Sequence, residues 1–108
     1  MIENDYGVLL IIEDDEGIFG SIGGIKAPWM MDNSQMMLME TWWWINEDKQ
    51  NHWAGALLIK AFIERAKILN IDFVIMVTLD GNKEEKLKET YHKLGFEHLE
   101  HHFIKKVN

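Results

Sequence analysis

Two apolar runs near the start of the chain are separated by a charged turn. Residues 7–12 form the first run, and the acidic segment 13–17 closes it. Residues 18–27 then form a glycine-punctuated run that ends at Pro28. Apolar runs bounded by turn residues and proline are typical of strands. The pattern therefore predicts a β-hairpin.

A third strand is predicted over residues 35–46, after the turn-prone segment 32–34. Both alternating sets of positions in 35–46 are mostly apolar. A strand that is covered on both faces shows this pattern, whereas a strand with one wet face alternates between apolar and polar residues. We expect a central strand.

The period changes in residues 54–70, where one stripe is apolar and the opposite stripe is charged. The apolar stripe consists of Leu58, Phe62, Ala66 and Leu69, and the charged stripe of Lys60, Glu64 and Lys67. Residues three and four apart share one side of a helix, so this spacing predicts an amphipathic helix.

Further elements are predicted in the last third of the chain. Residues 71–79 are β-branched and apolar and read as a buried strand. A second helix is expected to begin at Asn82, which can form a capping box with Glu85, and to end at Gly95. Its apolar stripe consists of Leu87, Tyr91 and Leu94. A final strand is expected over residues 97–107.

The order of these elements indicates one α/β (α+β) domain over residues 1–108, with a mixed sheet flanked by helices. A length of 108 residues fits a single domain, and 47% hydrophobic residues suffice for a packed interior. No linker, internal repeat or low-complexity segment interrupts the chain.

Charge, hydropathy and cysteine content argue against several classes of partner, location and site. The formal net charge is −7, which disfavours direct binding to nucleic acid or to an anionic membrane. No apolar run approaches the roughly 18 residues of a membrane span, and the N-terminus lacks a secretory signal pattern, so we expect a cytoplasmic protein. The absence of cysteine excludes thiolate nucleophiles and sulfur metal sites.

The loop before residue 54 is a candidate anion site. The N–H groups at a helix start have no partners within the helix, and the helix dipole favours negative charge there. Ala54 and Gly55 are small enough to let a pyrophosphate reach the main chain, and Gln50 is placed to reach over it. The alternative is an ordinary helix start whose donors bind water.

Two segments in the same order resemble the GNAT superfamily of N-acetyltransferases. Gln50 and Gly55 match the phosphate-loop signature, in which Trp53 departs from the first glycine. The segment 91–97, Tyr-His-Lys-Leu-Gly-Phe-Glu, resembles the family's helix-ending segment. The resemblance covers about residues 7–107. It is closest to small bacteriophage-type members, whose Pro-Trp and Glu-x-x-Trp-Trp patterns are echoed at 28–29 and 40–44.

This resemblance implies a GNAT-like mixed, mostly antiparallel sheet with two flanking helices, shortened at the N-terminus. It implies a V-shaped opening between residues 35–46 and 71–79 that holds acetyl-CoA as the acyl donor. Main-chain groups near Trp44 and Ile45 would pair with the pantetheine arm. The residues implied to hold the pyrophosphate are Gln50, Asn51, His52, Trp53, Ala54 and Gly55.

Glu40 is the candidate general base. A free lysine is neutral in only about one molecule in a thousand at pH 7, so transfer to an amine benefits from a proton acceptor. Glu40 stands among apolar residues of a predicted strand, where desolvation raises a carboxyl pKa. The alternative is a structural hydrogen bond or a solvent-facing position.

Tyr91 has the position that the family uses for the acid that protonates the departing thiolate. A phenol can do so only when it is held close to the sulfur. The alternative is that Tyr91, with Leu87 and Leu94, only forms the buried stripe of an amphipathic helix.

A histidine cluster and a tryptophan cluster are weaker candidates for functional sites. His98 and His102 would share one face of a strand while His101 points away, so we expect no metal site. The tryptophans at 42–44 could stack on bases, but the nearby acidic residues oppose a nucleic-acid strand, and core packing or groove lining fits better.

Complete family members place a strand and two helices before the first hairpin. We therefore expect an open acceptor side, or one closed by a second copy in a homodimer, and an amine on a protein or another large acceptor. One alternative is a catalytically inactive binding or inhibitor protein of the same fold, in which Trp53 fills the phosphate loop. Another is an acidic interaction protein, encoded by a virus, that covers a partner's basic surface.

Overall fold

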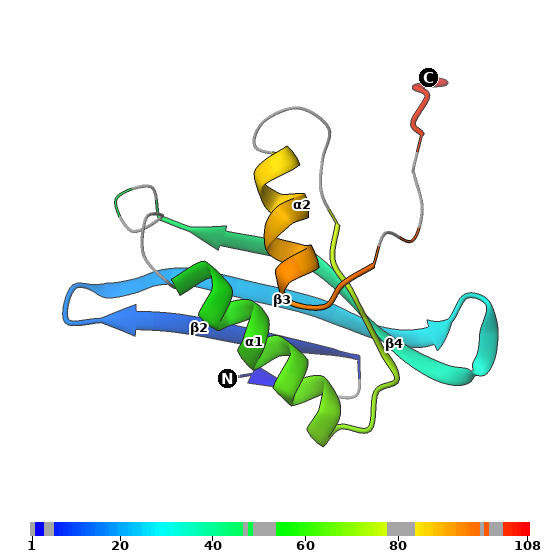
Figure 1. The fold of residues 1–108 in the computed structure, drawn as a ribbon, viewed down its shortest axis with the longest axis horizontal. Helices are drawn as coiled ribbons and strands as arrows, with labels where there is room; N and C mark the ends of the chain where they lie inside the picture. The colour runs from blue at the N-terminus through cyan, green and yellow to red at the C-terminus, as the bar shows by residue number, and fades with distance from the viewer. Residues whose placement is uncertain are drawn as a thin grey trace. The chain divides into compact units, whose positions relative to one another are not determined.

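The computed structural model describes residues 2–3, 6–46, 48, 54–77, 84–97, 99 and 103–108. The chain divides into two compact units, Met1–Val77 and Thr78–Asn108. The first unit contains β1 (Ile2–Glu3), β2 (Gly7–Asp14), β3 (Gly17–Trp29), β4 (Asp32–Ile45), α1 (Ala54–Ile68) and β5 (Phe73–Ile75), and the second contains α2 (Glu84–Lys93) (Figure 1). This is the predicted α+β class.

The five strands form one sheet in the order β1-β2-β3-β4-β5. The first four strands pair antiparallel, and β5 pairs parallel to β4. The predicted hairpin is confirmed as β2 and β3. Its turn ends at Gly17, whose φ of 117° lies in the region that favours glycine. The predicted central strand is confirmed as β4, which lies between β3 and β5.

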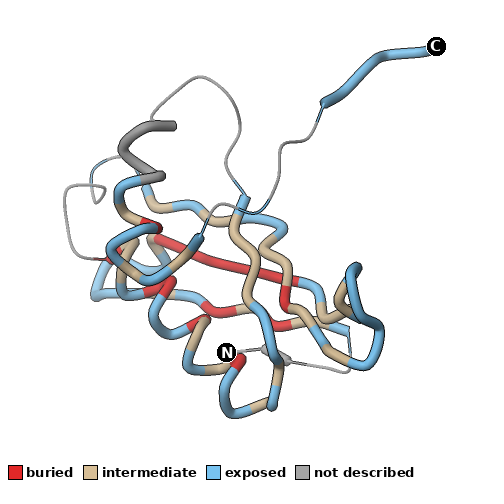
Figure 2. Tube along the Cα trace, turned by 45° about the vertical axis from the view of Figure 1, so that its right-hand side comes forward, coloured by how far each residue is buried: buried red, intermediate tan, exposed pale blue. Residues whose placement is uncertain are grey.

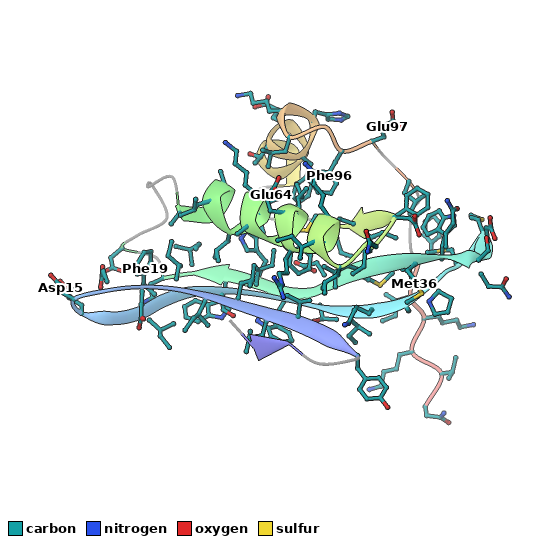
Figure 3. All side chains as sticks on the ribbon, turned by 90° about the horizontal axis from the view of Figure 1, so that it is seen from below. Asp15, Phe19, Met36, Glu64, Phe96 and Glu97 are labelled. Carbon is teal, nitrogen blue, oxygen red and sulfur yellow. The ribbon has the colours of Figure 1, made fainter. Side chains whose placement is uncertain are left out.

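Helix α1 covers one face of the sheet. Its side toward the sheet is buried through Ala54, Leu58, Ile59, Phe62 and Ala66, while Glu64 points away from the sheet (Figure 3). Lys67 and Glu64 form an exposed ion pair at 3.1 Å on that outer side. The predicted apolar and charged stripes of this helix are therefore confirmed.

The middle of β3 is the most buried part of the sheet. Residues 20–24 are all buried (Figure 2). A Cβ added at Gly24 would lie 2.5 Å from Cζ of Phe62 and 2.9 Å from the carbonyl oxygen of Met39. Glycine is therefore needed at this position, because α1 approaches the backbone of β3 too closely for a side chain.

Both helices end in the same arrangement of main-chain hydrogen bonds. At the end of α2, the N–H of Phe96 donates to the carbonyl of Tyr91 and the N–H of Gly95 donates to that of His92. Gly95 has a φ of 90°. At the end of α1, Asn70 has a φ of 58° and Ile71 donates to Ala66. These are Schellman motifs, which satisfy the last carbonyls of a helix.

Two predicted strands differ from the structure. β5 covers only Phe73–Ile75, because Met76 and Val77 are in no strand, and residues 78–79 lie outside the described residues. The predicted strand over 97–107 is wrong for the residues that are described there, namely 97, 99 and 103–107. Phe103 and Ile104 are almost fully exposed. Apolar alternation can suggest a strand, but it cannot supply the neighbouring strand that a ladder requires.

The capping position predicted at Asn82 lies outside the described residues, whereas the predicted end of the second helix at Gly95 is confirmed. Among the described residues, no helix is long and apolar enough to cross a membrane.

Candidate active site

A bulge in β4 follows Glu40. Gly24 pairs with Glu40 and Gly23 with Trp42, so Thr41 is an extra residue opposite β3. The Thr41 hydroxyl Oγ1 donates to the carbonyl of Gly23 at 3.2 Å. A bulge bends its strand and redirects the side chains on either side of it.

The pairing between β4 and β5 ends next to the same residue. Asp72 fixes the start of this pairing, since the N–H of Met36 donates to its Oδ2 at 2.8 Å and its own N–H donates to the Met36 carbonyl at 3.0 Å. The last pair is Met39 with Ile75. β4 continues to Ile45, so its edge away from β3 has no β5 partner after Met39 in the described residues.

Glu40 lies on the face of the sheet that α1 covers, because it pairs with Gly24, whose Cβ direction points to the Phe62 ring. Its side chain is half-buried. Burial raises the pKa of the Glu40 carboxyl from 4.5 to about 7, and no hydrogen bond or charge among the described residues contributes to that shift. Near neutral pH this carboxyl exists in both protonation states.

The three consecutive tryptophans divide between the two faces of the sheet. Trp43 pairs with Ile22 on the α1 face, and a Cβ added at Gly55 would lie 3.2 Å from Cζ2 of Trp43. Trp42 lies on the other face over Gly23, and its indole Nε1 donates to Oγ of Ser21 at 3.1 Å. Trp44 is on the same face as Trp42 and is 43% exposed.

The start of α1 retains the features of the predicted anion site. Ala54 is the first helical residue and is buried, and the first turn contains no acidic residue. Gly55 also has a packing role, because it lets α1 approach the Trp43 ring. The predicted contacts Gln50, Asn51, His52 and Trp53 lie outside the described residues.

The main-chain groups of Trp44 and Ile45 point toward opposite edges of β4. The N–H of Asn46 donates to the carbonyl of Phe19 in β3. Because successive residues alternate in direction, the peptide groups of Trp44 also face β3, whereas those of Ile45 face the other edge. Of the two predicted pantetheine contacts, Ile45 is thus the one directed toward the edge that β5 leaves.

Tyr91 lies in the last turn of α2 in the second unit. Its side chain is 8% exposed, and its ring is 5.7 Å from that of Phe96, measured between centroids. Tyr91 and Phe96 are the two residues that a Schellman motif brings into apolar contact. The structure thus gives Tyr91 a role in ending the helix. His98, His101 and His102 lie outside the described residues.

Two features of this site are missing from the sequence-based prediction. The bulge residue Thr41 carries no signal of its own, although adjacent glycines in a strand, here Gly23 and Gly24, often accompany a bulge. Asp72 reads as the polar boundary of a strand, and its role in joining β5 to β4 depends on a residue 36 positions away.

Comparison with solved structures shows the fold. An aminoglycoside acetyltransferase from an uncultured soil metagenomic sample is 16% identical, with a TM-score of 0.80 over 98% of this chain and 69% of that chain. AAC(6')-Iy in complex with the bisubstrate analogue CoA-S-monomethyl-acetylneamine is 13% identical, with a TM-score of 0.78 over 97% and 71%.

A ribosomal-protein-alanine N-acetyltransferase from Brucella melitensis biovar Abortus is 10% identical, with a TM-score of 0.76 over 97% of this chain and 74% of that chain. No protein-family model and no curated protein matches the sequence. The chain thus has the fold of GNAT acetyltransferases and spans about 70% of the length of these structures.

Proposed function

We propose that this protein transfers an acetyl group from acetyl-CoA to a primary amine on a protein or another large acceptor. The observation that carries the proposal is the position of Glu40. This carboxyl has a pKa of about 7, and it stands where β4 both bulges and parts from β5. A proton acceptor with a pKa near the working pH is the group that an amine acceptor requires.

The donor would be held by the main chain of β4 and by the start of α1. Peptide groups of Ile45 face the edge that β5 leaves, which is the side on which we place the pantetheine arm. The N–H groups of the first turn of α1, with no acidic side chain beside them, suit the pyrophosphate. The segment from Gln50 to Trp53 precedes this turn and is the remaining part of the proposed donor site.

In the proposed reaction, Glu40 accepts a proton from the acceptor ammonium, directly or through a water. The neutral amine nitrogen then forms a bond to the acetyl carbonyl carbon, and the carbon–sulfur bond breaks. Tyr91 is proposed to give its hydroxyl proton to the departing thiolate, and the second proton of the nitrogen, lost as the amide forms, passes through water to the Tyr91 phenolate, while Glu40 releases its proton to solvent. The products are an acetylated amine and CoA.

The acceptor class is supported by charge. With a net charge of −7, the protein attracts cationic groups such as lysine side chains and N-terminal amines. The compared structures include an enzyme named for a ribosomal protein and others named for aminoglycosides, and all of these acceptors carry amines.

Acetyl-CoA binding is the test of the donor site. A ligand that binds only the folded protein raises its melting temperature, so acetyl-CoA should raise Tm, and calorimetry should show one site per chain. Absence of any shift at millimolar acetyl-CoA would refute the proposal and would favour an inactive binding protein.

A matched pair of variants locates that site. Gly55→Glu and Gly55→Gln have side chains of similar size, so both disturb the contact with Trp43 to the same extent. An acidic residue in the first turn stabilises a helix but repels a pyrophosphate. We expect Gly55→Glu to bind acetyl-CoA at least tenfold more weakly than Gly55→Gln while being no less stable. Equal affinities would place the pyrophosphate elsewhere.

A further inference from the structure

The sheet face opposite α1 contains no charged side chain in its central part. We call it the uncharged face. It comprises Gly7, Leu9, Ile11, Ser21, Gly23, Ile25, Ala27, Met37, Met39, Trp42, Trp44, Phe73 and Ile75, which the strand register places together. Among the described residues of the first unit, no helix lies over this face (Figure 3).

Several large side chains of the uncharged face are exposed. Ile11, Ile25, Trp42, Trp44 and Phe73 expose 41%, 52%, 44%, 43% and 38% of their surfaces. Isolated exposed apolar residues are common, but contiguous patches mark sites of association. The orientation of Trp42 is fixed, because its ring lies against Gly23 and its Nε1 donates to Ser21. A rigid aromatic residue loses little entropy when it is covered.

We propose that a second copy of this chain covers the uncharged face and forms a twofold symmetric dimer in which two sheets stack. Two sheets commonly stack face to face at about 10 Å separation. A twofold contact joins the same patch on both copies, so an uncharged patch meets an uncharged patch and no charge is desolvated without a partner.

The size of the patch fits this occupant. A standard interface covers about 800 Å² per partner, of which roughly 60% is apolar, so it needs on the order of 500 Å² of apolar surface on each copy. The five exposed side chains, at roughly 150–250 Å² each before burial, supply on the order of 400–500 Å². Backbone and small residues of the neighbouring strands supply the rest.

Charge argues against other occupants. A basic or acidic partner would gain nothing from a face without charges and would leave its own charges unpaired. An anionic membrane would repel a protein of net charge −7. Between two copies the same net charge also opposes association, but salt screens it beyond about 8–10 Å. The dimer should therefore tighten as salt is added.

Sedimentation equilibrium of the full chain over roughly 1–300 μM tests the proposal, because interfaces of this size have dissociation constants of micromolar or below. We expect a monomer–dimer equilibrium or a dimer that is stabilised by salt. A monomer at every concentration would overturn the proposal.

Two variants locate the interface. Ile25→Lys lies in the centre of the uncharged face, and Ile68→Lys is the matched control at the exposed end of α1. Both reduce the net negative charge by one, so general repulsion weakens equally. Because the substitution occurs twice in a dimer, Ile25→Lys should weaken association on the order of 100-fold, and Ile68→Lys should leave it unchanged.

The milder variant Ile25→Thr is a control for loss of the fold, because it keeps a β-branched residue in the strand. Its dimer should be weaker than the wild-type dimer and stronger than that of Ile25→Lys, with circular dichroism unchanged. If both Ile25 variants associate as tightly as the wild type and the Ile68→Lys control, the dimer uses another surface and the proposal is wrong.

Discussion

Glu40 and Tyr91, the two residues proposed to move protons, differ in what else they do for the protein. Tyr91 ends α2: its carbonyl accepts from Phe96, and its ring lies against the Phe96 ring. Glu40 is a half-buried carboxyl whose pKa rises to about 7 through desolvation, with no hydrogen bond among the described residues to offset that effect.

This difference changes how strongly each sequence motif supports a catalytic role. In the segment 91–96, Tyr91, Gly95 and Phe96 are each accounted for by a Schellman motif, which needs a residue tolerant of positive φ between two apolar partners. The match to a helix-ending family segment is therefore explained by folding. Among the described residues, no hydrogen bond or ion pair gives Glu40 such a structural explanation, and a desolvated carboxyl without compensation is more typical of a reactive site.

The largest expected effect is the loss of transfer activity in Glu40→Gln. The amide keeps the size of the side chain but cannot accept the ammonium proton. We expect kcat/KM at neutral pH to fall by about 10²–10⁴-fold, and by progressively less at alkaline pH, where more acceptor amine is already neutral. Initial rates of CoA release are measured from about pH 6 to about pH 10. This range includes the pKa of Glu40 and approaches that of a lysine amine.

The wild-type profile has a defined sign. With a pKa of about 7, Glu40 is protonated below that pH and cannot act as a base, so the rate should rise as pH increases through about 7. Glu64→Gln is the matched control, because Glu64 is exposed on the far side of α1. If Glu40→Gln followed the same profile as Glu64→Gln, Glu40 would not be the base.

Tyr91→Phe separates the structural role of Tyr91 from its chemical role. Phenylalanine keeps the ring contact with Phe96, so stability and acetyl-CoA affinity should change little. Turnover should fall toward the lower end of the 10²–10⁴-fold range of a positioned general acid, because a thiolate with a pKa near 8.5 is a good leaving group. Unchanged turnover would leave Tyr91 with only its structural role.

A smaller effect is expected at the helix end itself. Gly95 has a φ of 90°, so Gly95→Ala should lower the free energy of unfolding by about 1–2 kcal/mol. Asn70→Gly is the companion variant at the end of α1, where a φ of 58° suits glycine, and its stability should stay close to that of the wild type. Urea unfolding of both variants provides the measurement. Equal stabilities would show that the Schellman motif of α2 contributes little.

The smallest effect concerns the stability of Glu40→Gln as pH changes. A carboxyl whose pKa is higher in the folded protein contributes stability below its unfolded value of about 4.5, and that contribution is lost as pH rises through about 7. The Tm of Glu40→Gln relative to the wild type should therefore increase from pH 4.5 to pH 8. Solvent screening keeps the change small for a half-exposed group. A difference that is constant with pH would contradict the raised pKa.

Much of the first unit could be predicted from sequence because its signals are local. The hairpin, β4 and α1 follow from apolar periodicity and from turn residues. In the second unit, Gly95 likewise marks the end of α2 through its backbone freedom. In each case the determining residues lie within one or two turns of the element.

The parts that could not be predicted depend on distant pairing. β5 is short because β4 stops pairing with it after Met39, and the strand expected over 97–107 lacks a neighbour in the described residues. Likewise, the position of Glu40 could be suspected from its apolar neighbours, but the bulge at Thr41 beside it depends on the register with Gly23 and Gly24. The catalytic role of Glu40 stays a prediction.

Transfer of labelled acetyl groups tests directly whether this protein acetylates amines with Glu40 as the base. The purified protein is incubated with isotopically labelled acetyl-CoA and a cell lysate, and modified residues are mapped by mass spectrometry. In a separate reaction without lysate, CoA release to an amine acceptor that has no thiol is followed with a thiol reagent. The chain contains no cysteine, so it adds no thiol signal of its own. We expect label on protein amines, with Glu40→Gln far below the wild type. Label at the level of a reaction without the protein, despite bound acetyl-CoA, would contradict it.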